Sequence, residues 1–339
     1  MFDLKLLNQM LNEGYVNIQK HPEADLFIYN YSQKAQYDSI WNEVTLQCRG
    51  LILDKDNNVI ARPFKKIFNL GESDNQFIPD EAFQVYEKMD GSLGILYWLN
   101  GKPAIATRGS FTSEQSFKAN IILNEKYTHL FSKLDKNKTY LFEIIYPENR
   151  IVIDYAQTVD LFLLAIIENH SGNELNLEDI GFPVAKRYDG INDINKLIEL
   201  EENNREGFVI KFDRGLRYKV KFKEYIRIHR IVTQVSTINI WEYLKKGQSL
   251  DELLDRVPDE FYNWVKKINS DLLNAYKAIE EKAKNEFKNL ETRKGTALYF
   301  QQCSYPSLLF SMLDEKDYSK TIWKMLRPKF SKPFANFEE

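Results

Sequence analysis

One short segment of this 339-residue chain, YEKMDGSLGILYW at residues 86–98, places a lysine two residues before an aspartate and three before a glycine. Lys88 could act as a nucleophile if its amine lost a proton, which burial or neighbouring cations favour by lowering the pKa. Lowering a lysine pKa by roughly three units costs about 4 kcal/mol. Asp90 could hold a metal ion, and Gly91 would let a ligand approach the backbone. The alternative is that Lys88 is a solvated charge at a sheet edge.

Few other residues compete with Lys88 for a catalytic role. The sequence contains no glycine-rich phosphate-binding loop, no dinucleotide-binding glycine fingerprint and no paired histidines of the zinc-protease type. The four histidines are scattered singly, so each is more readily structural than catalytic. Taken alone, Lys-x-Asp-Gly is a weak signal, because it arises by chance in roughly one chain of this length in ten.

A second feature is a basic stretch between Arg205 and Arg230. It holds nine basic and three acidic residues, a local charge of +6, although the whole chain carries −3. The basic residues alternate with Phe, Val, Leu, Tyr and Ile, which is the period-two pattern of a strand. That alternation would place Arg217, Lys219 and Lys221 on one face, and we expect an anion to bind there. A solvated charged face is the commoner explanation for such a run.

These two features belong to an ordered set of motifs. Before Lys88 the sequence has CRGLILD and ARPFKKIFNLGE. After it come RGSFTSEQSFKAN and then FEIIYPENRIVIDY with Glu143. EGFVIKF with Glu206 and YKVKF with Lys219 and Lys221 follow further along the chain. The set resembles the covalent nucleotidyltransferases, the superfamily of ATP-dependent polynucleotide ligases and mRNA capping enzymes. Within the superfamily it is most similar to the RNA ligase 1 family of T-even bacteriophages. The resemblance extends from about residue 27 to 230 and is faint in the tail.

The resemblance implies a role for each matched residue around the adenylate. Lys88 would attack the α-phosphate of ATP and form a lysyl-adenylate, with release of pyrophosphate. Glu87 would read the adenine edge, and Val209 would form a wall of the adenine pocket. Lys219 and Lys221 would contact the α-phosphate and its neighbours.

The resemblance also implies a metal site. Asp90 and Glu206 would hold the catalytic magnesium, with manganese as an alternative ion, and Glu143 would hold the ribose or the water shell of the metal. Tyr225 matches the family as well, without a defined role. The competing explanations are a sheet-edge ion pair for Glu143 and core packing for Tyr225.

Three cations match the family positions that clamp the triphosphate tail of ATP: Arg49, Lys66 and Arg108. The family has lysine where this chain has Arg108, so the residue differs while its charge is kept. Arg49 and Lys66 could otherwise be ordinary surface charges.

The reaction that the family performs has three steps: adenylylation of the enzyme, transfer of AMP to an RNA 5′-phosphate, and attack by a 3′-hydroxyl that displaces AMP. The expected partner is therefore RNA with 5′-phosphate and 3′-hydroxyl ends, for example a nicked tRNA in RNA repair. One alternative is a ligase that prefers single-stranded DNA or other ends. The other is a non-catalytic RNA-end binding protein of the same fold. Retention of Lys88, Glu143, Glu206 and Lys221 argues against the non-catalytic protein.

The elements that must position these residues alternate short strands with turns from about residue 25 to 235. Residues 83–97 read as a hairpin with Asp90-Gly91 as its turn, and residues 56–58 and Asn100-Gly101 read as further hairpin turns. Thr112 or Ser113 is the expected N-cap of a following helix. This order predicts an α+β domain of antiparallel sheets with flanking helices over residues 1–235, the adenylyltransferase domain.

After residue 236 the pattern becomes helical. A capping-box pattern occupies residues 249–252, Pro258 suits a first helical turn, and apolar residues recur at helical spacing for about 30 residues from Phe261. Residues 236–339 therefore read as a helical domain that recognises the RNA substrate. Its segment 240–339 carries 17 basic and 16 acidic residues, so any RNA contact must rest on a local patch or on shape.

Composition sets the remaining limits. The sequence has no run of 18 apolar residues, and its first residues read as an amphipathic helix instead of a signal peptide. Cys48 and Cys303 match neither a zinc pattern nor a disulfide framework. We therefore expect a cytoplasmic protein of a bacterial or phage-infected cell, with no membrane partner and no obligate protein partner.

Overall fold

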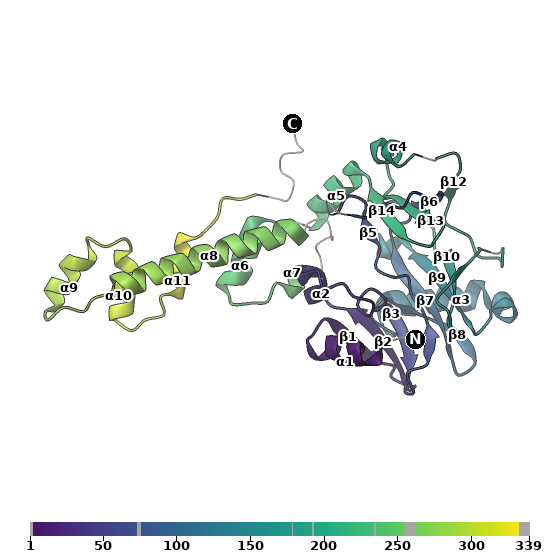
Figure 1. Ribbon diagram of the computed structural model, residues 1–339, viewed down its shortest axis with the longest axis horizontal. Helices are drawn as coiled ribbons and strands as arrows, with labels where there is room; N and C mark the ends of the chain where they lie inside the picture. Colours follow the sequence, from purple (N-terminus) through teal and green to yellow (C-terminus); the bar gives the residue numbers. More distant parts are fainter. Residues whose placement is uncertain are drawn as a thin grey trace. The chain divides into compact units, whose positions relative to one another are not determined.

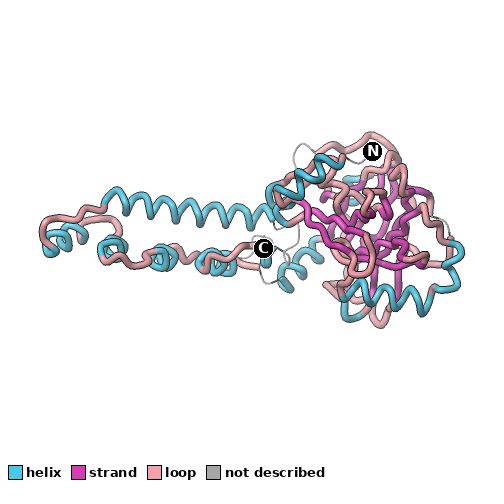
Figure 2. The backbone as a smooth tube through the Cα atoms, turned by 90° about the horizontal axis from the view of Figure 1, so that it is seen from below, coloured by secondary structure: helices cyan, strands magenta, loops and turns pink. Residues whose placement is uncertain are grey.

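The computed structural model describes residues 3–72, 76–177, 179–191, 193–233, 235–254 and 262–331. The chain divides into two compact units, Met1–His229 and Arg230–Glu339. Strands occur in the first unit, and the described part of the second contains helices and loops alone (Figure 1, Figure 2). The predicted α+β class, with antiparallel sheets followed by helices, is confirmed. The functions assigned to residues 1–235 and 236–339 stay predictions.

The N-terminal sheet is a four-stranded antiparallel sheet in the order β1-β2-β3-β4. An amphipathic helix, α1, precedes it, and its Leu7 and Met10 are buried in a cluster with Val16 and Leu51. A second short helix, α2, leads from β2 toward β3. The elements are α1 (Leu4–Asn12), β1 (Val16–Lys20), β2 (Leu26–Tyr31), α2 (Gln33–Asp38), β3 (Arg49–Asp54) and β4 (Val59–Ala61).

The central sheet has five antiparallel strands in the order β11-β10-β9-β7-β8. One face packs against the N-terminal sheet through Ile28, Ile52, Ile95 and Leu141, among others. The other face buries Phe142 with residues of α3. The elements are β7 (Ser92–Leu99), β8 (Lys102–Thr107), α3 (Glu114–Lys126), η1 (Thr128–Lys133), β9 (Lys138–Ile145), η2 (Pro147–Asn149), β10 (Asp160–Glu168) and β11 (Glu174–Leu175).

The third sheet, called here the Lys88 sheet, has the order β12-β6-β13-β14-β5, antiparallel except for the β14–β5 pair. One of its faces buries Val85, Phe208 and Ile210 together with Leu197 of α4 and Tyr225 of α5. The elements are β5 (Phe68–Asn69), β6 (Phe83–Lys88), β12 (Arg187–Tyr188), α4 (Ile194–Glu199), β13 (Gly207–Phe212), β14 (Arg217–Lys221) and α5 (Lys223–Thr233).

Residues 83–97 do not form the predicted hairpin. Strand β6 pairs with β12 and β13, whereas β7 pairs with β9 and β8, so the two strands belong to different sheets. Asp90 and Gly91 carry the chain from one sheet to the other. The prediction was wrong because period-two alternation identifies strands without identifying their partners, and Asp-Gly also suits a close backbone crossing. A Cβ on Gly91 would lie 2.6 Å from the carbonyl oxygen of Ile144.

Other local predictions are confirmed. Residues 55–58 connect β3 and β4, with Asn57 in the left-handed region at φ 64°. Asn100 and Gly101 connect β7 and β8 with positive φ at both positions, as a tight hairpin turn requires. Ser113 is the N-cap of α3, and its hydroxyl accepts a hydrogen bond from the backbone N–H of Ser116.

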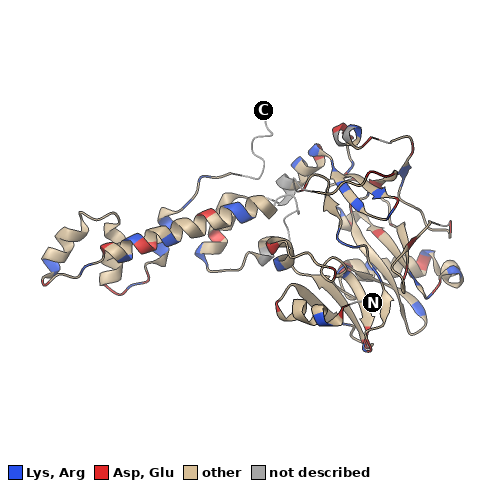
Figure 3. Ribbon diagram, in the orientation of Figure 1, with Lys and Arg blue, Asp and Glu red and all other residues tan. Residues whose placement is uncertain are grey.

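The second unit is built on one long helix, α8, which carries acidic and basic residues along its length (Figure 3). Its core gathers Ala283, Phe300, Leu308, Leu309 and Ile322 from four helices. Pro258 and Phe261 lie outside the described residues. The elements are α6 (Thr237–Lys245), α7 (Asp251–Leu254), α8 (Tyr262–Glu286), α9 (Arg293–Phe300), α10 (Pro306–Leu313) and α11 (Ser319–Met325). No helix within the described ranges is long and apolar enough to cross a membrane.

Candidate active site

Strand register brings the two central lysines of the site together. Lys88, the last residue of β6, lies opposite Gly207 of β13, and Gly207 lies opposite Lys221 of β14. Gly207 has a φ of +146°, and a Cβ there would lie 1.9 Å from the carbonyl oxygen of Val220. Glycine is thus required by both conformation and space at the point that separates the two lysines.

Glu206 bridges these lysines. Its Oε2 lies 2.8 Å from Nζ of Lys88, and its Oε1 lies 3.3 Å from Nζ of Lys221. The Glu206 side chain is 3% exposed, so the carboxylate is desolvated and depends on both partners. The sequence led us to expect cations that would favour the neutral amine of Lys88. The structure instead places a carboxylate, that of Glu206, against the Lys88 ammonium.

Alternation along the strands decides which other predicted residues share this face. Lys219 and Val209 lie opposite each other on β14 and β13, on the same face as Lys88 and Lys221. Glu87, which precedes Lys88 on β6, turns to the opposite face, where its cross-strand neighbour is the buried Phe208. Glu87 as a reader of the adenine edge stays a prediction.

The third basic residue predicted for this face, Arg217, has the expected orientation but is already paired. Its guanidinium and the ammonium of Lys211 both bind the carboxylate of Glu174 on β11, with shortest distances of 2.5 Å and 2.7 Å. All three side chains are less than one-fifth exposed. This cluster ties the Lys88 sheet to the central sheet, and it engages Arg217 in an ion pair away from Glu206.

Glu143 reaches the site from β9 of the central sheet. Its Oε1 accepts a hydrogen bond of 2.9 Å from the backbone N–H of Gly91. The pKa of Glu143 is raised from 4.5 to about 7, chiefly by burial; Glu206 and Asp90 contribute to the rise, while Lys88 and the Gly91 N–H oppose it. Two carboxylates, Glu143 and Glu206, therefore influence each other beside Lys88.

Asp90 has a different environment. Its Oδ2 accepts hydrogen bonds of 2.9 Å from the backbone N–H groups of Val152 and Ile153, and its Oδ1 accepts one of 2.8 Å from the hydroxyl of Tyr225. The Asp90 N–H donates to the Tyr155 hydroxyl oxygen at 2.8 Å. Asp90 is 3% exposed. Both carboxylate oxygens of Asp90 thus accept hydrogen bonds from the protein itself. These bonds hold the Lys88–Gly91 segment, helix α5 and the 150–157 loop together.

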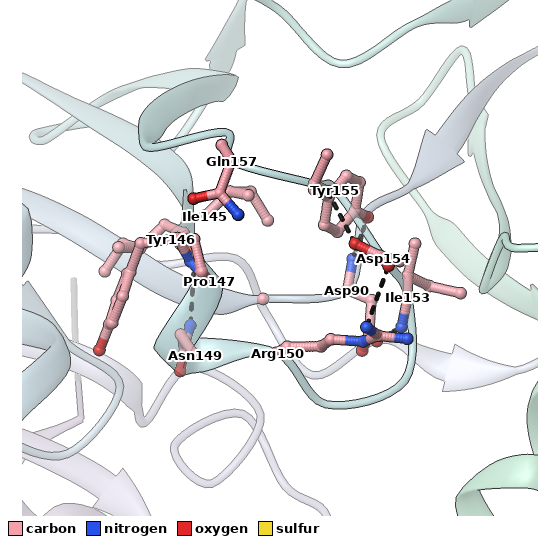
Figure 4. Close-up of a pocket in the computed structure, with 13 residues that line it drawn as sticks. Asp90, Ile145, Tyr146, Pro147, Asn149, Arg150, Ile153, Asp154, Tyr155 and Gln157 are labelled. Atoms are coloured by element: carbon pink, nitrogen blue, oxygen red, sulfur yellow. Dashed lines mark hydrogen bonds and ion pairs between the residues drawn. The ribbon is translucent and has the colours of Figure 1, made fainter.

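A cavity of about 280 Å³ opens beside Asp90 and Gly91 (Figure 4). It is lined mainly by residues 144–157, which comprise the end of β9 and the segment after it. Arg150 and Asp154, an ion pair at 3.1 Å, belong to this lining. Sequence reasoning treated this segment as one motif and missed Tyr155 as a partner of Asp90. The signal was present, since Tyr155 is the last residue of FEIIYPENRIVIDY.

The predicted triphosphate clamp is drawn together around Tyr31. The Lys66 ammonium lies 5.5 Å and the Arg108 guanidinium carbon 5.4 Å from the centroid of the Tyr31 ring. Arg49 lies opposite Asn30, the residue before Tyr31, across the β2–β3 pair. Sequence positions 49, 66 and 108 thus meet in one region, although their contact with ATP stays a prediction.

The three carboxylates predicted to form a metal site differ in how well they suit a divalent ion. In the ranges that the structure describes, no group of three or more His, Cys, Asp or Glu residues is arranged to hold a metal. Asp90 is committed to other partners, so the three predicted carboxylates do not form a ready-made cage. Glu143 and Glu206 do fit, because they are neighbouring desolvated carboxylates and oxygen donors suit Mg²⁺.

Comparison with known proteins identifies the family. A family model described as RNA ligase matches residues 47–226, more than half of the chain. A candidate RNA ligase from Thermovibrio ammonificans is 29% identical over 253 residues, which cover 69% of this chain and 65% of the relative; the match thus spans just under two thirds of that relative's length. The RNA ligase of Rhodothermus phage RM378 is 23% identical, and the match covers 91% of this chain and 90% of the phage protein.

A solved structure agrees on the fold. An archaeal ATP-dependent RNA ligase superposes with a TM-score of 0.51 at 15% sequence identity, covering 88% of this chain and 85% of the archaeal chain. At that identity the likeness concerns the fold alone. The family match includes Lys88, Glu143, Glu206, Lys219 and Lys221. The chain belongs to the RNA ligase family.

Proposed function

We propose that the protein is an ATP-dependent RNA ligase that joins a 5′-phosphate to a 3′-hydroxyl through a lysyl-adenylate on Lys88. The observation that carries the proposal is the Lys88–Glu206–Lys221 arrangement across Gly207, which lies within the region that matches the family. ATP is a substrate of this reaction. RNA is the second substrate, as it is for the relatives named RNA ligase.

The first step forms a bond between Nζ of Lys88 and the α-phosphorus of ATP. The bond from that phosphorus to the β-phosphate oxygen breaks, and pyrophosphate leaves. Lys88 must lose a proton to attack, and Glu206, with Oε2 at 2.8 Å, is within reach to receive it. Lys219 and Lys221 share the face of Lys88 and stabilise the charge on the phosphate as it develops.

The next two steps regenerate the enzyme. An oxygen of the RNA 5′-phosphate attacks the α-phosphorus of the adenylate, and the bond to Lys88 breaks. The RNA 3′-hydroxyl then attacks the activated 5′-phosphate, AMP leaves, and a phosphodiester bond remains. Both steps need positioning and charge stabilisation more than acid–base groups, which suits a site made of lysines and carboxylates.

Glu143 and Glu206 are the residues that would hold a divalent cation, magnesium or manganese. Bound there, the ion would supply positive charge that neutralises the phosphates and orients the leaving group. Asp90 acts by positioning: its hydrogen bonds fix Tyr225 and the 150–157 loop around the crossing that presents Lys88. Its direct coordination of the metal, which the sequence suggested, is the weaker assignment.

The helical unit is proposed to recognise the RNA. Lys245 and Arg327, both exposed, lie 4.7 Å and 5.8 Å from the ring centroid of Trp241, so α6 and the segment that follows α11 present two cations close together. A local patch of this kind could bind RNA phosphates even though the unit as a whole is close to neutral. A nicked tRNA is one RNA that would offer both ends and a folded shape.

The test is a sealing assay with RNA carrying 5′-phosphate and 3′-hydroxyl ends, run beside RNA that is already adenylylated at its 5′ end. The wild type should seal both, the first with ATP alone. Lys88→Ala should seal only the adenylylated RNA, because that substrate bypasses the lysyl intermediate. Sealing of the 5′-phosphate RNA by Lys88→Ala with ATP would refute the assignment, and preference for single-stranded DNA ends would change the substrate.

A further inference from the structure

Lys66 is unusual in being a nearly buried lysine, 6% exposed, among aromatic rings. Its Nζ donates a hydrogen bond of 2.7 Å to Oε1 of Gln36. The same atom lies 5.5 Å from the ring centroid of Tyr31, 5.2 Å from that of Trp41 and 5.7 Å from that of Phe68. We call Gln36, Tyr31, Trp41 and Phe68 the Lys66 cage.

The cage is rigid because its rings hold one another. Tyr31 and Trp41 meet edge to face at 5.1 Å and 89°, and Trp41 and Phe68 meet in the same way at 5.6 Å and 86°. Trp41 is therefore the central ring, in contact with both others. Edge-to-face pairs stabilise a structure beyond the area that they bury. The members come from β2, α2, the loop after α2, and β5, so the cage is assembled by the fold.

The chemistry of the cage bears on what Lys66 can do. The amide oxygen and the faces of the rings stabilise the ammonium through a hydrogen bond and cation–π contacts. A lysine side chain ordinarily loses rotamer entropy when it is fixed on a ligand. In the cage the side chain of Lys66 is already fixed in the folded protein, so binding a ligand would cost little further rotamer entropy. The cage thus fixes the position of the Lys66 ammonium. The Arg108 guanidinium also contacts the cage, with its carbon 5.4 Å from the centroid of the Tyr31 ring.

We propose that Trp41 and Gln36 are positioning residues that fix the Lys66 ammonium for the polyphosphate part of ATP, the part that leaves as pyrophosphate. The proposal rests on the proposed function and adds two residues to it that lie outside the matched family region. It separates the first step of the reaction from the later ones. Only the first step contains a polyphosphate, so the cage should matter for adenylylation and not for sealing of RNA that is already adenylylated.

The experiment compares Trp41→Leu and Gln36→Glu with the wild type in two assays. Trp41→Leu removes the central ring, and Gln36→Glu places a carboxylate against the ammonium in place of the neutral amide oxygen. Each should raise the KM for ATP in adenylylation by about tenfold, the range expected for a desolvated cation–π contact. Each should leave the rate of sealing adenylylated RNA within about twofold of the wild type. Inorganic tripolyphosphate should inhibit both variants more weakly, whereas AMP should inhibit them as before.

Trp98→Leu is the matched control. Trp98 is also half-buried and also has a lysine over its ring, Lys136 at 5.2 Å, but it lies on β7 away from the cage. This variant should keep the KM for ATP. If Trp41→Leu does not fold, Gln36→Glu still tests the proposal, because it retains every ring.

Two results would overturn the inference. One is an unchanged KM for ATP in both cage variants. The other is an equal loss in adenylylation and in sealing of adenylylated RNA, which would mean that the cage only supports the fold. Failure of the proposed function is a separate outcome, since the wild type would then form no adenylate at all.

Discussion

At the residue scale, one carboxylate serves two lysines. Glu206 binds both Lys88, the proposed nucleophile, and Lys221, so removal of either lysine leaves the desolvated carboxylate with one cationic partner fewer. Glu143 is affected by the same charges, because Lys88 lowers its pKa and Glu206 raises it. Its raised pKa reports an environment that disfavours the anion, which an added cation would relieve.

Glu143→Gln should therefore raise the free energy of unfolding at neutral and higher pH while slowing adenylylation. Folded Glu143 keeps its proton up to about pH 7, whereas the unfolded carboxyl loses it near 4.5, so folding stability falls as the pH rises between these values. The variant escapes that loss. Its free energy of unfolding should exceed that of the wild type at pH 8 by up to about 3 kcal/mol, with little difference at pH 4. Adenylylation should fall because the ligand charge is gone.

Urea unfolding at the two pH values measures this effect. Glu224→Gln is the control with the opposite sign, because the hydrogen bond from Arg227 lowers the pKa of Glu224. A stability difference for Glu143→Gln that is the same at both pH values would contradict the account.

Tyr225→Phe should weaken the site through Asp90. The variant removes the hydroxyl that donates to Oδ1 of the buried aspartate, which should cost about 1–3 kcal/mol of stability and slow adenylylation. Tyr218→Phe is the control, because its hydroxyl donates instead to the backbone carbonyl of Phe77. The control should lose some stability and keep its adenylylation rate. Equal rates in the two variants would remove Tyr225 from the site.

The sequence predicted some of the site residues and none of the contacts that hold them in place. Lys88, Glu206 and Lys221 could be predicted as one site, because motif order places them together. The bridging by Glu206 could not, since it depends on strand register around Gly207. The partners of Asp90 were also invisible, because they are backbone N–H groups more than 60 residues away along the chain. Gln36 and Trp41 carry no motif at all.

At the element scale, the site depends on where strands cross and pair. The chain passes between two sheets at Asp90 and Gly91, which places the end of β6 beside Glu143 of β9. Alternation along each strand predicted the strands and the shared face of Arg217, Lys219 and Lys221. It did not predict that β6 and β7 belong to different sheets, because strand pairing depends on residues far apart in the sequence.

Gly207→Ala tests this scale. The added methyl would meet the Val220 carbonyl oxygen at 1.9 Å, so β13 and β14 must separate and Lys221 must leave Glu206. Adenylylation should fall at least about a hundredfold, with loss of stability. Gly215→Ala is the matched control: it also has a positive φ, but a Cβ there has no atom within 4 Å. That variant should lose about 1 kcal/mol and remain active. Similar activity of the two variants would contradict the register argument.

At the scale of the whole molecule, two units divide the proposed work. The first holds the residues of adenylylation, and the second, by proposal, binds RNA. The sequence indicated this change of structure through its change from period-two to helical spacing near residue 236. The local patch of Lys245 and Arg327 could not be found from the sequence, because 82 residues separate two cations that share one ring.

The double variant Lys245→Glu/Arg327→Glu should weaken RNA binding and flatten its dependence on salt, while adenylylation stays unchanged because that step needs no RNA. Lys284→Glu/Lys316→Glu is the matched control, since these lysines already pair with Glu280 and Asp314. Filter binding over a salt series measures the slopes. Equal slopes for the two double variants would place RNA recognition elsewhere.

The central claim is that Lys88 carries the adenylate, and covalent labelling tests it most directly. The protein would be incubated with magnesium and ATP labelled on the α-phosphate, digested, and the labelled peptide sequenced. We predict one labelled residue, Lys88, no label in Lys88→Ala, and loss of the label on addition of pyrophosphate. A label on another residue, or the same labelling in Lys88→Ala, would contradict the account.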